Sequence, residues 1–292
     1  MSAGSMRCRF MNKLSGPQKS EGGASQEDRN NWPSMLKKLS IPKNILSTPH
    51  GNFNLIVRVR GLNLILQKEK SRLFDEWPEE YDRWFATPIG ALIKKYEGEL
   101  LRELLDPAPG EIILDAGCGT GVFTLDMLSR GAKVIGLDIS MPMLNRAGPK
   151  ARGYWFRTVL GDIANLPFPE GSFDRVASVT TLEFIEDGRR AFSELFRVTK
   201  RGGTIVVATL NSLSPWASRR RAEANKKHTL FEKAIFRSPD ELRSLAPVEG
   251  VIKTAIHFQK EDNTHVAAEI ELEGRRKKLN TGAFVVGRWG KI

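Results

Sequence analysis

Apolar runs and amphipathic segments alternate along most of the chain after residue 110. Continuous apolar runs favour buried strands, whereas apolar residues three and four positions apart favour helices. Strands that alternate with helices are typical of a parallel sheet covered on both faces. The pattern predicts strands at 111–116, 133–138, 158–160, 175–179 and 204–210, with helices over 122–130, from 140, and from 187 to a stop at Gly202-Gly203.

A helical pattern also precedes the first strand. Thr87 suits the N-cap position, and Pro88 suits the first turn, where its missing N–H costs nothing. Apolar residues then recur at helical spacing over 89–105, ahead of a stop at Pro107. We expect this helix to pack on the sheet, with the segment 75–85 as further helical cover before it.

The first predicted strand leads into a glycine-rich turn, with the sequence Leu-Asp-Ala-Gly-Cys-Gly-Thr-Gly over 114–121. Gly117, Gly119 and Gly121 carry no Cβ, so the backbone can turn tightly and approach a ligand closely. The helix that follows directs unpaired N–H groups and its positive end at that ligand. Glycines also mark ordinary turns, but the flanking strand and helix favour a ligand-binding turn.

A carboxylate closes the second predicted strand, 17 residues after Gly121. Asp138 is placed there to accept hydrogen bonds from a ribose diol, so the two features together predict a site for a nucleotide-like cofactor. The dinucleotide pattern Gly-x-Gly-x-x-Gly/Ala does not fit, because Val122 occupies its third glycine position.

The pattern Asp-x-Gly-x-Gly-x-Gly from Asp115 resembles motif I of the class I S-adenosylmethionine-dependent methyltransferases. The resemblance spans about residues 75–292 and is nearest to the small-molecule branch (methyltransferase type 11) that includes quinone-biosynthesis enzymes. It implies S-adenosylmethionine as cofactor and a doubly wound, seven-stranded, Rossmann-like α/β sheet, mostly parallel with an antiparallel last strand. Its further matching segments are Asp138, 161–163, 166–168, 173–180 and 201–203, and its last two strands correspond to 251–258 and 283–289.

The same resemblance implies a cofactor site. Asp138 matches the ribose-binding acid, and Asp162 is placed to hold the adenine amino group. Tyr81 and Trp84 resemble a lid over the cofactor, although two core rings would show the same pattern. The residues expected to contact the cofactor are Tyr81, Asp115, Gly117, Cys118, Gly119, Gly121, Asp138, Ile139, Asp162, Ile163 and Thr180.

Methyl transfer from a sulfonium is an in-line displacement with an already activated electrophile, so the protein chiefly supplies alignment and desolvation. A base helps where the acceptor is a hydroxyl or a carbon acid. Glu183, Asp187 and His228 are candidates for that base by position only, and Glu183 also suits a wall of the cofactor pocket. Residues 180–184 lack the Asn/Asp-Pro-Pro-Tyr/Phe signature of enzymes that methylate amino groups of nucleic acids or glutamine, which disfavours those acceptors.

An insertion at 211–245 separates the fifth and sixth predicted strands. It holds Trp216, Phe231, Phe236 and a basic run that includes residues 219–221. In related methyltransferases this region builds part of the acceptor pocket, so the insertion suits an apolar, anionic acceptor. A solvated amphipathic helix with one packed aromatic side is the alternative.

The net charge of +11 is concentrated at the front of the chain. Residues 1–72 hold 13 Lys and Arg against 4 Asp and Glu, which leaves only +2 for residues 73–292. We therefore predict a methyltransferase domain over 73–292 and a basic, poorly ordered extension over 1–72. A targeting segment, a partner-binding arm or a start drawn too long are alternatives for that extension.

Cysteine and histidine usage limits the chemistry further. Two cysteines are too few for a disulfide framework, which favours a reducing, cytoplasmic setting, and four scattered histidines lack metal-ligand spacing. The apolar stretch 55–66 is too short to span a bilayer. The sequence predicts methyl transfer to a small molecule, with an RNA- or protein-directed enzyme or a non-catalytic cofactor-binding subunit as alternatives; the oligomeric state stays open.

Overall fold

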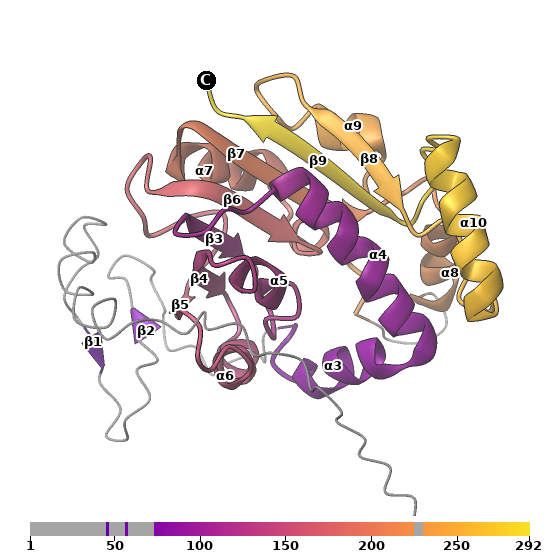
Figure 1. The fold of residues 1–292 in the computed structure, drawn as a ribbon, viewed down its shortest axis with the longest axis horizontal. Coiled ribbons are helices and arrows are strands. Elements are labelled where there is room, and N and C mark those ends of the chain that lie inside the picture. Colours follow the sequence, from indigo (N-terminus) through magenta and orange to yellow (C-terminus); the bar gives the residue numbers. More distant parts are fainter. Residues whose placement is uncertain (1–44, 47–55, 58–72, 225–229) are drawn as a thin grey trace, which may run out of the picture.

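The computed structural model describes residues 45–46, 56–57, 73–224 and 230–292 (Figure 1). Its centre is a seven-stranded sheet in the order β5-β4-β3-β6-β7-β9-β8. The strands are β3 (Ile112–Ala116), β4 (Lys133–Asp138), β5 (Phe156–Leu160), β6 (Phe173–Val179), β7 (Thr199–Leu210), β8 (Val251–Ala255) and β9 (Phe284–Gly290).

Strand direction confirms the predicted α/β sheet. Strands β5, β4, β3, β6 and β7 pair in parallel, and β9 runs antiparallel to both β7 and β8. The chain builds outward from β3 through β4 to β5, and then crosses to β6 on the other side of β3. The carboxyl ends of β3 and β6 therefore lie where the winding reverses, the place where open α/β sheets bind ligands.

Helices cover both faces of the sheet (Figure 1). One face packs against α4, α5, α6 and α10, and the other against α7 and α9. Neighbouring strand residues alternate between the two cores, as Ile113 and Leu114 do, because side chains of a strand point to opposite faces. The described helices are α3 (Pro78–Ala86), α4 (Pro88–Leu105), α5 (Thr124–Leu128), α6 (Met141–Lys150), α7 (Gly188–Val198), α8 (Pro215–Ala224), α9 (Pro239–Arg243) and α10 (Thr264–Arg276).

Local capping signals place the helix starts. The Thr87 side chain accepts a hydrogen bond from the Gly90 N–H at the start of α4, as predicted. Asp187 accepts from the Arg190 N–H at the start of α7, which confirms its predicted capping role. Each of these side chains satisfies one N–H that the first helical turn leaves unpaired.

One prediction about secondary structure was wrong, and one helix was not predicted. Helix α7 ends at Val198 rather than at Gly202-Gly203, and those glycines lie within β7, which begins at Thr199. Helix α10 was not predicted, because it buries only Ala267, Glu271 and Gly274, which give almost no apolar periodicity.

Two short strands come from the front of the chain. Strand β1 (Ile45–Leu46) pairs antiparallel with β2 (Ile56–Val57), and β2 lies near the edge strand β5. The rest of the predicted extension over 1–72 lies outside the described residues. Of the helices that the structure describes, none has the length and apolar character needed to cross a membrane.

Candidate active site

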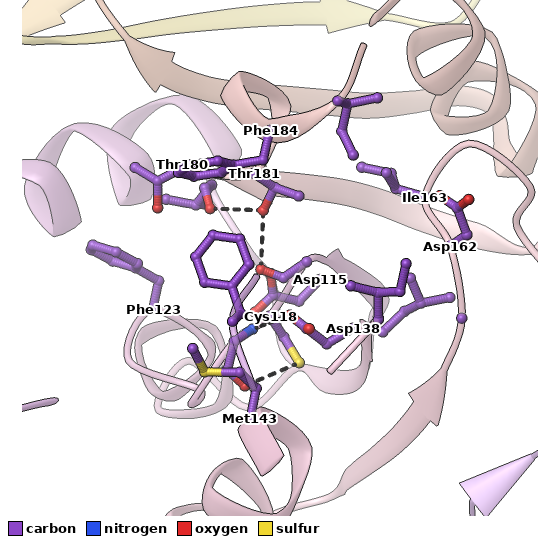
Figure 2. A pocket seen from close by; sticks show the side chains of 18 of the residues that line it. Asp115, Cys118, Phe123, Asp138, Met143, Asp162, Ile163, Thr180, Thr181 and Phe184 are labelled. Atoms are coloured by element: carbon purple, nitrogen blue, oxygen red, sulfur yellow. Dashed lines mark hydrogen bonds between the residues drawn. The ribbon is translucent and has the colours of Figure 1, made fainter. Parts of the chain in front are cut away.

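A cavity of about 340 Å³ opens at the carboxyl ends of β3, β4 and β6 (Figure 2). Ten of the eleven residues predicted to contact the cofactor line this cavity, Gly121 being the exception. Much of the remaining wall is apolar. That wall comprises Leu73, Phe74, Val122, Phe123, Leu137, Met143, Val179, Phe184 and Ile185.

The glycine turn after β3 takes a backbone conformation that favours glycine. Gly117, Gly119 and Gly121 have φ angles of 83°, 51° and 79°. A Cβ on Gly117 would lie 2.1 Å from the Thr181 hydroxyl oxygen, whereas a Cβ on Gly119 would meet no protein atom within 4 Å. Because Gly119 also lines the cavity, its missing side chain leaves room for a ligand.

Gly121 has a different role. A Cβ there would lie 3.3 Å from the Cβ of Ala147 on α6, so this glycine allows the turn to pack closely against the helix. The regular alternation of the three glycines along the sequence gives no sign of this difference.

Asp138 joins the glycine turn to the segment that leads into α6. Its carboxylate accepts hydrogen bonds from the Gly119 N–H and the Ser140 N–H, both at 2.8 Å. Burial raises the pKa of Asp138, although these backbone hydrogen bonds oppose the rise. Each carboxylate oxygen retains a further lone pair, which suits the two hydroxyls of a ribose.

Asp115 is the other acid of the turn. Its carboxylate accepts a hydrogen bond of 2.6 Å from the Thr124 hydroxyl. Burial, together with the negative charge of Asp138, raises the pKa of Asp115 to about 7. A positively charged group of a ligand nearby would favour the ionised form. Cys118 is buried and burial also raises the pKa of its thiol, which argues against a nucleophilic role.

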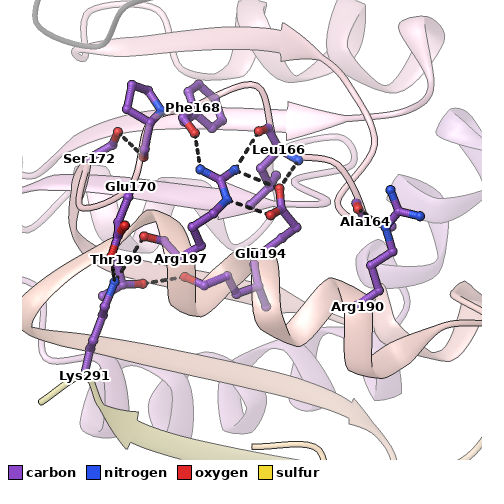
Figure 3. Close-up of polar contacts among 12 residues, drawn as sticks. Ala164, Leu166, Phe168, Glu170, Ser172, Arg190, Glu194, Arg197, Thr199 and Lys291 are labelled. Carbon is purple, nitrogen blue, oxygen red and sulfur yellow. Dashed lines mark hydrogen bonds and ion pairs between the residues drawn. The ribbon is translucent and has the colours of Figure 1, made fainter. Parts of the chain in front are cut away.

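The loop after β5 brings Asp162 and Ile163 to the cavity. The Asp162 carboxylate accepts a hydrogen bond of 2.8 Å from the Ala164 N–H, which shapes the loop locally. Helix α7 then fixes the rest of the loop (Figure 3). Glu194 accepts from the Leu166 N–H at 2.7 Å, and Arg197 donates to the carbonyl oxygens of Leu166 and Phe168 at 2.9 and 2.6 Å.

Thr180 follows β6 and has a φ of 47°. A β-branched residue is strained in that region, and strain of this kind is concentrated at binding sites. The Thr180 hydroxyl bonds to Tyr81, which also lines the cavity. Burial raises the pKa of Tyr81 well above its usual value, so the phenol stays protonated.

Helix α3 carries Tyr81 and is held against the turn by Asp82. The Asp82 carboxylate accepts from the Thr120 hydroxyl at 2.6 Å, from Arg146 Nε at 2.6 Å and from Lys150 Nζ at 2.5 Å. Of the two rings predicted as a lid, only Tyr81 lines the cavity. Trp84 packs against the core, and Lys260 Nζ lies 5.4 Å from its ring centroid.

Substitution of Asp82 tests whether this attachment positions Tyr81. We expect Asp82→Ala to weaken cofactor binding three- to tenfold, since α3 loses its three hydrogen bonds to the glycine turn and α6. Glu79→Ala is the matched control. Glu79 lies on α3 like Asp82 and also pairs with Arg146, at 3.4 Å, but this pair is exposed and contributes little. Calorimetric titration with S-adenosylhomocysteine compares the variants, and equal affinities would show that α3 needs no such attachment.

The candidates for a catalytic base lie apart from the cavity or outside the described residues. Glu183 belongs to the short helical turn η1 (Leu182–Phe184) and is fully buried without lining the cavity. Asp187 is occupied as the cap of α7, and His228 lies outside the described residues. Within the described ranges, no group of three or more His, Cys, Asp and Glu is arranged to hold a metal ion.

Apart from Phe184, the apolar residues of the cavity wall named above were missed in the sequence. Phe74, Phe123 and Phe184 come from three distant segments, and the Phe74 and Phe184 rings meet edge to face at 4.7 Å. Phe184 belongs to the segment 180–184 after the fourth predicted strand, and the sequence predicted that this segment faces the crevice. The cavity thus combines acids with an aromatic wall, as a nucleoside bearing a charged tail requires.

Comparison with known proteins identifies the family. A family model described as "Methyltransferase domain" matches residues 114–207. The malonyl-[acyl-carrier protein] O-methyltransferase of Serratia marcescens is 30% identical over 193 residues, covering 59% of this chain and 75% of that protein. The demethylmenaquinone methyltransferase of Thermobifida fusca is 29% identical over 194 residues, covering 60% and 81%.

A solved structure agrees with these matches. The S-adenosylmethionine-dependent methyltransferase of Thermotoga maritima, titled a possible histamine N-methyltransferase, superposes with a TM-score of 0.58 at 26% identity. It covers 75% of this chain and 99% of its own. The chain therefore belongs to the methyltransferase-domain family and is an S-adenosylmethionine-dependent methyltransferase.

Proposed function

We propose that this enzyme methylates a small-molecule acceptor that approaches the cavity from the side of Phe184. The observation that carries the proposal is the cavity itself, which Asp138 and the open side of Gly119 line together with aromatic rings. Relatives named for malonyl-[acyl-carrier protein] and demethylmenaquinone support an acceptor group of small size.

The residues fit S-adenosylmethionine in specific roles. Asp138 would accept from the ribose hydroxyls, the loop at 161–163 would border the adenine, and Asp115 would face the cationic part of the cofactor. The cofactor supplies a methyl group made electrophilic by its sulfonium. The chain supplies alignment and exclusion of water, since the apolar wall keeps competing nucleophiles away.

Two measurements test this function. Calorimetry should detect binding of S-adenosylmethionine or S-adenosylhomocysteine and no binding of NAD, and preferential binding of NAD would exclude the assignment. Incubation of metabolite extracts with the enzyme and a labelled methyl donor should then give a labelled product of low mass. Label found only in RNA or protein would contradict a small-molecule acceptor and would instead support an RNA- or protein-directed methyltransferase.

We also propose that residues 73–292 form the complete catalytic unit. We further propose a reducing, cytoplasmic setting, which suits the buried free thiol of Cys118. Of the described residues, those that line the cavity lie at Leu73 or beyond. We expect a chain that begins at Leu73 to fold and to bind S-adenosylhomocysteine within a few-fold of the full-length protein. Precipitation or loss of binding would show that the segment near β2, which approaches β5, belongs to the domain.

A further inference from the structure

Three charged side chains form one stripe along α7. Arg190, Glu194 and Arg197 are separated by four and three positions, a spacing that brings helical residues onto one face. All three bind the same loop, which leads from β5 to β6 (Figure 3). No member of this α7 stripe lines the cofactor cavity, so any effect of the stripe on the cofactor passes through the loop.

The α7 stripe satisfies four backbone groups of the loop. Arg190 Nε donates to the Ala164 carbonyl oxygen at 2.9 Å. The other two members bind the Leu166 N–H and the carbonyl oxygens of Leu166 and Phe168. These loop residues belong to no strand, so their backbone groups have no partners in the sheet and depend on side chains instead.

Glu194 and Arg197 also fix each other. Arg197 Nε and Nη2 donate to the two carboxylate oxygens of Glu194 at 2.7 and 2.8 Å, a bidentate geometry. The Arg197 guanidinium holds the pKa of Glu194 below its usual value, so the pair is ionised at neutral pH. Because Arg197 Nη1 binds the loop as well, each guanidinium nitrogen is engaged, and the loop is held by a rigid group.

The loop begins with a closed turn at the cavity. The Asn165 N–H donates to the Asp162 carbonyl oxygen at 3.0 Å, and the Ala164 N–H donates to Asp162 Oδ1 at 2.8 Å. Where the chain enters the turn, the Gly161 N–H donates to the Asp138 carbonyl oxygen at 2.9 Å. The α7 stripe attaches the other end of the turn. The direction of the Asp162 carboxylate, which lines the cavity, therefore depends on α7 (Figure 2).

The chemistry of a carboxylate at this place distinguishes between purine bases. An ionised carboxylate accepts hydrogen bonds and donates none. Adenine presents a 6-amino group, which donates, whereas hypoxanthine presents a 6-oxo group, which accepts. A carboxylate held at that edge of the base favours adenine and rejects hypoxanthine, because the 6-oxo group would leave it unpaired. A carboxylate that is turned away does neither.

We propose that the α7 stripe positions Asp162 and thereby sets the preference of the enzyme for an adenine base in its cofactor. Arg190, Glu194 and Arg197 are positioning residues, which act through the loop and do not touch the cofactor. The inference rests on the proposed function, because that function assigns the loop at 161–163 to the adenine. It goes further in placing the control of base preference on a helix outside the cavity.

Calorimetry with S-adenosylhomocysteine and S-inosylhomocysteine measures this preference, since the second ligand carries hypoxanthine in place of adenine. We expect the full-length enzyme to bind S-adenosylhomocysteine at least tenfold more tightly. Arg197→Met should weaken S-adenosylhomocysteine binding at least fivefold and change S-inosylhomocysteine binding less than twofold. A merely structural role of Arg197 would lower the thermal stability and leave the ratio of the two affinities unchanged.

Neighbouring arginines on α7 provide a matched pair of variants. Arg189 donates to the Ser244 carbonyl oxygen at 3.1 Å, away from the loop, so Arg189→Met should keep the full preference for adenine. Arg190→Met removes one exposed contact with the loop and should lower the preference at least twofold. This milder variant also carries the test if Arg197→Met does not fold.

A double substitution tests whether the α7 stripe acts through Asp162. Asp162→Ala should abolish the preference for adenine, and Arg197→Met should lower it no further in that background. An unchanged preference in Arg197→Met and Arg190→Met overturns the inference, as does an equal loss in Arg189→Met and Arg190→Met. An unsubstituted enzyme that binds both ligands equally overturns it too and leaves the methyltransferase assignment intact. The calorimetry contains no acceptor, so the labelled-methyl experiment detects failure of the proposed small-molecule function separately.

Discussion

Replacement of Gly119 by valine is expected to weaken binding of S-adenosylmethionine and S-adenosylhomocysteine at least a hundredfold. Two effects act together. A β-branched residue at a φ of 51° is strained by about 1–3 kcal/mol. In addition, the new side chain would occupy space that is free of protein atoms within 4 Å and lies in the wall of the cavity. A hundredfold loss corresponds to about 2.7 kcal/mol of binding free energy.

Gly110 offers a control that separates the two effects. Its φ is 82°, and a Cβ there would also meet nothing within 4 Å, but Gly110 does not line the cavity. Gly110→Val should therefore lower the thermal stability about as much as Gly119→Val does, and leave the affinity for S-adenosylhomocysteine unchanged. Normal affinity in Gly119→Val would show that the turn serves the fold and leaves the ligand to other residues.

Signals close together in the sequence were the ones that predicted structure well. The glycine turn, the acid at the end of β4 and the capping residues Thr87 and Asp187 each depend on a few neighbouring positions. The order of strands and helices then follows from apolar patterning, because a parallel sheet needs helices on both faces. These features made the fold and the cofactor predictable.

Contacts between distant segments could not be predicted in the same way. Asp82 meets Thr120, Arg146 and Lys150, which lie 38, 64 and 68 residues further along the chain. In the sequence Asp82 is one acid among several in a charged segment, and nothing distinguishes it from Glu79. Only the packing of α3 against α6 gives the two residues different roles.

The insertion at 211–245, which was expected to form part of the acceptor pocket, was still harder to interpret from the sequence. The sequence indicated that the insertion at 211–245 holds aromatic and basic residues, but three consecutive arginines look alike. The structure separates them: Arg219 pairs with Glu223 and Glu261 at the surface, whereas Arg220 turns toward Trp216 and Phe231. Packing, which depends on the whole fold, decides which arginine pairs with acids and which lies against aromatic rings.

Replacement of Asp138 by alanine is expected to have the second large effect, and its expected effect on stability differs from what the sequence suggested. A residue at the end of a strand, facing a crevice, is expected to contribute little to folding. The structure shows that Asp138 also accepts from the N–H groups of Gly119 and Ser140. The substitution leaves the buried Ser140 N–H and the half-buried Gly119 N–H without this partner, at about 1–3 kcal/mol for the buried donor, so thermal stability should fall as well.

Asp138→Ala is nevertheless expected to lose more cofactor affinity than the loss of these two backbone hydrogen bonds would cause by itself. Charge-assisted hydrogen bonds from two ribose hydroxyls are worth about 1.5–3 kcal/mol, which corresponds to about one to two decades of affinity. Ser140→Ala is the matched control, because Ser140 caps α6 and donates to Asp75 but does not line the cavity. We expect Ser140→Ala to stay within threefold of the unsubstituted enzyme in titrations with S-adenosylhomocysteine, and Asp138→Ala to lose at least thirtyfold. If the two variants lost affinity equally, Asp138 would act by shaping the turn, and the ribose would be held elsewhere.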